Sequence, residues 1–140
     1  MMTNIEAAER KSRARAIVFL LMAIALIAAT WMNSNDTGEQ PVRLGTWLAM
    51  VALVALNLTP FAMRRARAPL ASLLNDETTQ VHRQQSFGAG FWASLAASAS
   101  LAIVASAVPI TALFAVKVVI AAAMVAALVS FAVQELRAAR

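Results

Sequence analysis

The sequence predicts an all-α membrane protein in which four transmembrane helices form two hairpins joined by a cytoplasmic linker. Two observations lead to this fold class: 61% of the 140 residues are hydrophobic, and the charged residues lie mainly between long apolar runs. A water-soluble chain of this length does not need so many apolar residues, so we expect the excess to face lipid. Cysteine is absent, which excludes disulfides, thiolate metal sites and cysteine nucleophiles.

The first span is predicted at residues 14–32, after a polar N-terminus at residues 1–13. About 20 apolar residues, at about 1.5 Å of rise each, cross a hydrocarbon core of about 30 Å. A cleaved signal peptide is the alternative for this stretch. The apolar run is longer than a usual signal sequence and Trp31 follows it at the depth of interfacial aromatics, so we favour a retained span.

A short loop at residues 33–43 leads to the second predicted span at residues 44–63. Gly38 and Pro41 in this loop are typical of a turn. Trp47 opens the second span much as Trp31 closes the first, so we expect both indoles at one membrane interface as an aromatic belt.

Residues 87–131 form a stretch of 45 residues with a single charge. A helix of this length is too long for a single crossing of the membrane. Pro109 is the natural turning point. The sequence therefore predicts spans at residues 87–108 and 111–133, a turn at residues 109–110, and a polar tail at residues 134–140.

The distribution of basic residues predicts the orientation. Ten of the twelve Lys and Arg residues lie in residues 1–15, in the central segment at residues 64–86, or in the C-terminal tail. By the positive-inside rule, both termini and the central segment are cytoplasmic. We expect Arg64, Arg65 and Arg67 to bind anionic lipid headgroups as topological anchors, and we do not expect nucleic-acid binding.

Small residues recur at every fourth position of the last two predicted spans, which favours close helix packing. This contact is expected within one chain, and a homodimer is the alternative. The residues concerned are Gly90, Ser94, Ser98, Ala102, Ala122 and Ala126.

Lys117 is the one charge well inside a predicted span, about 9 Å past Thr111 along the helix. We expect its side chain to extend to the nearby interface, with a substrate or ion role as the alternative.

The central segment is predicted to form an interfacial helix ending at Leu74, followed by a helix that begins at Asn75 or Asp76 and runs into the third span. Asp76, Glu77 and Arg83 are the candidate docking residues for a cytoplasmic or membrane partner. His82 and the neighbouring acids are spaced poorly for a metal site, so no metal, cofactor or catalytic residue is predicted.

The pattern LNDETTQVHRQQSFGAGFW at residues 74–92 resembles the linker of small bacterial four-helix membrane proteins that have no assigned activity. The resemblance implies a bacterial inner-membrane location. The expected function is that of a non-enzymatic accessory or regulatory membrane component acting through its linker. A small oligomeric transporter or channel-like protein is the alternative.

Overall fold

The computed structural model describes residues 4–32, 41–58 and 77–138, all of them helical except the connection at residues 106–111. The helices are α1 (Asn4–Met32), α2 (Pro41–Leu58), α5 (Glu77–Ala105) and α6 (Ala112–Ala138). Each of the four is long and apolar enough to cross a membrane. The prediction of an all-helical chain with four helices of spanning length is therefore confirmed.

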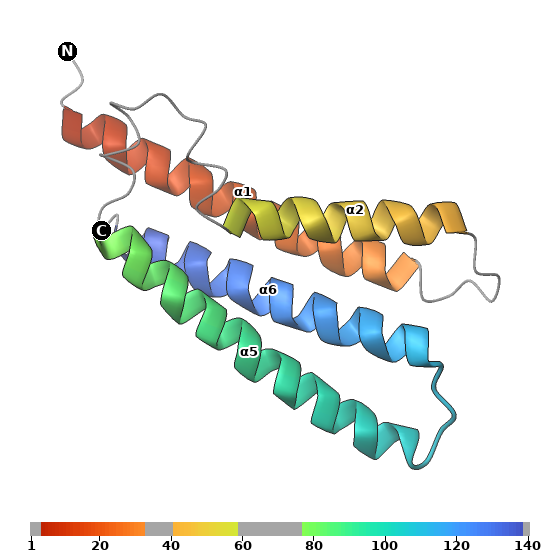
Figure 1. Cartoon of the computed structure of the whole chain (residues 1–140). Coiled ribbons are helices and arrows are strands. Elements are labelled where there is room, and N and C mark those ends of the chain that lie inside the picture. Colours follow the sequence, from red (N-terminus) through yellow and green to blue (C-terminus); the bar gives the residue numbers. More distant parts are fainter. Residues whose placement is uncertain (1–3, 33–40, 59–76, 139–140) are drawn as a thin grey trace.

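Consecutive helices alternate in direction, so the start of α1, the end of α2, the start of α5 and the end of α6 lie at one end of the bundle (Figure 1). Helix α6 lies between α1 and α5 and packs closely against both, while α2 makes smaller contacts with α1 and α6. The C-terminal helix is thus the central element of the fold.

The helix bounds follow backbone hydrogen bonding more than hydropathy. Helix α5 begins at Glu77, ten residues ahead of the predicted span 87–108, in agreement with the helix predicted to begin at Asn75 or Asp76 and to run into that span. Pro41 is the first residue of α2, where its missing N–H would have no intrahelical partner. Predicted features at residues 59–76, including Arg64, Arg65, Arg67 and the interfacial helix, lie outside the described residues.

The turn between α5 and α6 has a clear local cause. Pro109 disfavours helical geometry at Val108, so α5 ends with tightened bonds such as Ala107 N–H to Val104 O at 3.0 Å. Thr111 then caps α6, because its Oγ1 accepts a hydrogen bond from Phe114 N–H at 3.4 Å.

The buried core is small and centres on α6. Ala16, Phe19 and Ala23 of α1 meet Val54 and Leu58 of α2 against one face of α6. That face carries Ala127, Leu128, Phe131 and Ala132.

Large apolar side chains cover the outside of the bundle. On α1 they include Leu21 at 59% and Ile24 at 62% exposed, and on α5 Phe91 at 60% and Ile103 at 72%. So much exposed apolar surface would drive aggregation in water but matches the acyl chains of a bilayer. Together with the four long apolar helices, it indicates a multi-pass membrane protein.

Candidate functional site

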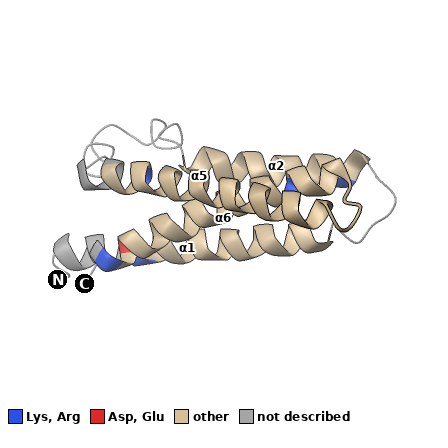
Figure 2. Cartoon of the chain, turned by 90° about the horizontal axis from the view of Figure 1, so that it is seen from below, with Lys and Arg blue, Asp and Glu red and all other residues tan. Residues whose placement is uncertain are grey.

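Three charged side chains from three helices lie near one another at the end of the bundle where α1 begins and α6 ends. Arg83 of α5 is 7% exposed, Glu135 of α6 is 8% exposed, and Arg15 of α1 is partly buried. Charged side chains are rarely buried unless they are paired. We call Arg15, Arg83 and Glu135 the charged cluster; Figure 2 shows basic and acidic positions near this end of the molecule.

The charges of the cluster do not cancel. The Arg15 guanidinium is close enough to feel attraction from the Glu135 carboxylate and repulsion from the Arg83 guanidinium. Arg83 and Glu135 each have an interaction partner. The cluster itself thus holds two guanidiniums and one carboxylate.

Aromatic rings fix the position of Arg15. Its Cζ atom lies 4.9 Å from the Phe131 ring centroid and 5.6 Å from that of Phe19. The two rings pack edge to face, with centroids 5.1 Å apart and an interplanar angle of 89°. Both the ring pair and the cation–π contacts join α1 to α6, so the cluster also holds these helices together.

Polar groups of α5 and α6 surround the charged cluster. Ser86 is fully buried and its hydroxyl donates to His82 O at 2.6 Å. Gln134 Nε2 donates to Ser130 Oγ at 3.0 Å. Among the side chains that the structure describes, His82 Nδ1 and Gln134 Oε1 are buried without a hydrogen-bond partner. The interior of this end of the bundle therefore holds polar groups as well as charged ones.

An apolar groove begins about one helical turn from the charged cluster, between α2, α5 and α6. This three-helix groove has a volume of about 220 Å³. Leu58 of α2, Phe87 and Phe91 of α5, and Met124 of α6 are among the residues that line it. Its lining is almost entirely apolar, so it does not attract water.

Gly90 lets α5 approach α6 at the floor of the three-helix groove. A Cβ atom at this position would lie 2.8 Å from Ala123 O and 3.3 Å from Ala127 Cβ, so no larger residue fits without a shift. A Cβ atom at Gly88, by contrast, would have nothing within 4 Å. Gly90 is therefore a point of close contact between these two helices.

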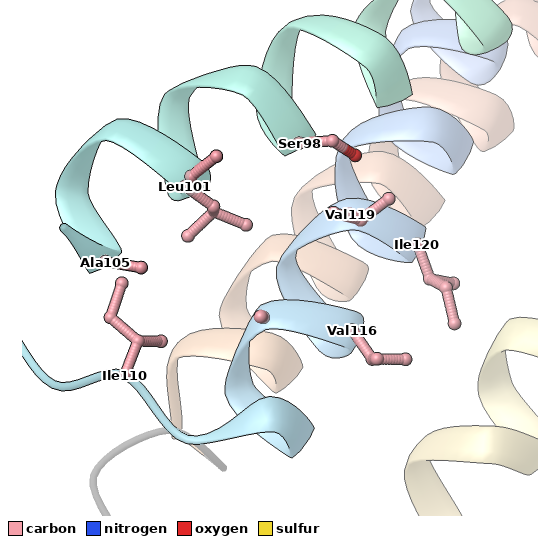
Figure 3. A pocket seen from close by; sticks show the side chains of 9 residues that line it. Ser98, Leu101, Ala105, Ile110, Val116, Val119 and Ile120 are labelled. Carbon is pink, nitrogen blue, oxygen red and sulfur yellow. The ribbon is translucent and has the colours of Figure 1, made fainter.

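A second groove lies between α5 and α6, toward the turn that joins them. This two-helix groove has a volume of about 430 Å³. Figure 3 shows Leu101, Ala105 and Ile110 on one side of it and Val116 and Val119 on the other. It is apolar and open, as expected for a surface that faces acyl chains.

The small residues predicted to pack helices have different surroundings. Gly90 and Ser94 line the three-helix groove, whereas Ser98 and Ala102 line the two-helix groove. The hydroxyls of Ser94 and Ser98 donate to carbonyls of their own helix, at 2.7 and 2.8 Å, and so are satisfied without a partner helix. On α6, the alanines that meet Gly90 are Ala123 and Ala127, while Ala122 and Ala126 are partly buried beside them.

The two tryptophans that the sequence places at one interface differ in exposure. Trp31 is 71% exposed, but Trp47 is 2% exposed and its Nε1–H donates to Thr30 Oγ1 at 3.1 Å. The Thr30 hydroxyl in turn donates to Leu26 O at 2.8 Å. Trp47 therefore joins α2 to α1, a contact that the sequence pattern does not reveal. The position of both indoles at one membrane interface stays a prediction.

Lys117 is 9% exposed and lies far from the charged cluster. It precedes Phe131 by fourteen residues, which is about 21 Å of helix, and so lies toward the opposite end of the bundle. Most of its side chain is covered by protein. Its extension to the interface stays a prediction.

The predicted docking residues are only partly described. Asp76 lies outside the described residues, and Glu77 is the first residue of α5. Arg83 is buried and belongs to the charged cluster. Among the residues that the structure describes, no three His, Cys, Asp or Glu side chains form a group that could hold a metal ion.

The sequence analysis does not single out Arg15 or Glu135, which lie at or just beyond the ends of the predicted spans 14–32 and 111–133. A signal was present, because Arg15 precedes Phe19 by four residues and Glu135 follows Phe131 by four. Each pair shares one helix face. Nothing in a single sequence, however, says that these two faces meet.

A comparison of this chain with protein-family models, with curated proteins and with solved structures finds no match.

Proposed function

We propose that this protein is a non-enzymatic accessory or regulatory component of the bacterial inner membrane that acts on a partner through its cytoplasmic linker. In this proposal the four helices form two hairpins, and both termini and the linker at residues 64–86 are cytoplasmic. The proposal includes no cofactor and no nucleic acid.

One observation carries the proposal: the charged cluster lies at the end of the bundle where α2 ends and α5 begins. The linker therefore starts and finishes at the end where the described helices place buried charge. Ten of the twelve Lys and Arg residues also belong to the three segments expected on this side. The positive-inside rule supports a cytoplasmic position for such a side.

Site-specific photo-crosslinking in living cells tests the partner. A photoreactive residue would replace Glu77, and a matched control would replace Asp36 in the loop expected on the opposite side. We expect a discrete crosslinked protein from position 77 that is absent from position 36. The proposal fails if the two positions give the same products, or if Asp76→Ala in the photoreactive chain leaves the crosslink yield unchanged.

A small oligomeric transporter is the second candidate, because α5 is the helix least covered by the rest of the chain. Only 6% of its Val81–Ala105 span is buried, against 17% to 22% of the other three spans. A second copy covering this helix would build a larger assembly. Solute flux into liposomes that contain the purified wild type or Lys117→Met tests this candidate. The candidate fails if the wild-type liposomes take up solute no faster than empty liposomes.

A further inference from the structure

The charged cluster lies next to the three-helix groove along α5 and α6. Arg83 precedes Phe87 by four residues, so about 6 Å of α5 separates the charge from the mouth of the groove. On α6, Ala127 lines the groove, and Phe131 and Glu135 follow it at intervals of four residues. The three-helix groove and the charged cluster are thus neighbours along α5 and α6.

The spacing matches the layers of a bilayer. A typical bilayer has an interfacial layer of about 5 to 8 Å on each side of its hydrocarbon core. On α5 the Cα atoms of Arg83 and the groove residue Phe87 lie about 6 Å apart along the helix axis. A molecule that fits both features has an acyl chain joined to an anionic group over this distance.

The apolar part alone would not select an occupant. Lipid tails are as apolar as the side chains that line the groove, so moving an acyl chain into it gains only packing. Selectivity must come from charge. In the three segments expected on this side, residues 1–15, 64–86 and 134–140, ten Lys and Arg residues stand against five Asp and Glu residues.

Arginine is suited to one anionic chemistry in particular. Its planar guanidinium binds phosphate oxygens in a two-pronged arrangement and is less strongly hydrated than an ammonium group. Arg15 keeps part of its surface exposed, while the rings of Phe19 and Phe131 hold it in place. The partly exposed Arg15 guanidinium, held in place beside the buried Arg83 guanidinium, is therefore suited to binding a phosphate group.

We propose that one anionic glycerophospholipid binds here, with an acyl chain in the three-helix groove and its phosphate beside Arg15 and Arg83. The site requires the chain to lie in a membrane but does not depend on the proposed partner protein. Arg83 keeps its existing interactions, because the attraction arises from the excess of basic groups. The bound lipid would fill the open space between α2 and α5.

Native mass spectrometry of the purified full-length protein tests this site. The protein would be delipidated in mild detergent and offered equal amounts of phosphatidylglycerol and phosphatidylcholine. We expect retention of phosphatidylglycerol in preference to phosphatidylcholine. Loss of one guanidinium in Arg83→Gln should weaken retention about fivefold, the effect of one basic residue at an anionic membrane surface.

Two matched pairs of variants test the contribution of the charge and that of the groove separately. Ser94→Leu fills the three-helix groove and should lower retention, whereas Ser98→Leu one turn further along α5 affects the two-helix groove and should not. Arg137→Gln removes the same charge as Arg83→Gln from an exposed position and should have little effect. If Arg83→Gln does not fold, the comparison of Ser94→Leu with Ser98→Leu still tests the proposal.

Several results would overturn the proposal. Equal retention of the two lipids would show that charge does not select the occupant. Identical behaviour of Ser94→Leu and Ser98→Leu would show that the groove is not involved. Displacement of the lipid by inorganic phosphate at the same concentration would assign the site to free phosphate, and a dimer that forms only without lipid would assign the groove to a second copy.

Discussion

Replacing Gly90 with alanine should force α5 away from α6, and the neighbouring Gly88 provides a matched control. Removing a glycine from a helix interior stabilises it by about 1 kcal/mol through backbone propensity, and both variants gain this. Only Gly90→Ala adds a methyl group in contact, at 2.8 Å from the backbone oxygen of Ala123. Because that atom belongs to a helix backbone, it cannot move alone.

The expected loss of stability in Gly90→Ala follows from comparing the surroundings of Gly90 and Gly88. Overpacking of a well-packed contact costs about 1 to 3 kcal/mol. Gly88→Ala has nothing within 4 Å and is expected to be as stable as the wild type or more stable. We therefore expect Gly90→Ala to be less stable than Gly88→Ala by about 1 to 3 kcal/mol.

Denaturation in mild detergent with increasing dodecyl sulfate, followed by circular dichroism, measures this difference. The two variants have the same composition and differ only in the position of one methyl group. Equal midpoints for Gly88→Ala and Gly90→Ala would refute the close approach of α5 and α6 at Gly90.

The other variants test single contacts in the same assay. Thr30→Val leaves the buried indole N–H of Trp47 without its acceptor and should destabilise the protein by about 1 to 2 kcal/mol. Glu135→Gln removes the carboxylate that faces Arg15 and should cost about 1 to 3 kcal/mol, less than a fully buried pair because Arg15 is partly exposed. Thr111→Ala removes the cap of α6 and should cost about 0.5 to 2 kcal/mol.

Each of these variants has its own control. Thr46→Val removes an exposed hydroxyl that bonds only within its own helix, to Val42 O at 2.9 Å, and should change stability little. The double variant Glu135→Gln with Arg15→Gln should be less unstable than the sum of the single changes, because the two groups interact. Strict additivity would argue against their contact.

Much of the helical framework could be predicted from the sequence, because lipid exposure leaves a strong signal in hydropathy. Long apolar runs identified all four helices, and Pro109 identified the turn between the last two. The start of α5 at Glu77 also agrees with the helix predicted from Asn75 or Asp76 into the third span, because the capping residues and not the apolar run indicated that start. Hydropathy marks where a helix meets lipid and does not mark where it ends.

The contacts between helices could not be predicted in the same way. Helix α6 is so rich in alanine that two neighbouring ladders of small residues are available, one through Ala122 and Ala126 and one through Ala123 and Ala127. The structure turns the second ladder toward Gly90, while Phe131 faces α1. That rotation is set by side chains on other helices, which a repeat within one helix does not reveal.

The orientation of the chain is the claim on which the proposed function depends most directly. The protein has no cysteine, so a single introduced cysteine can be labelled without background. Asp36→Cys and Asn75→Cys would be treated in spheroplasts with a maleimide that does not cross membranes. The proposed topology predicts labelling of Asp36→Cys in intact spheroplasts and of Asn75→Cys only after the membrane is opened; labelling of Asn75→Cys from outside would contradict it.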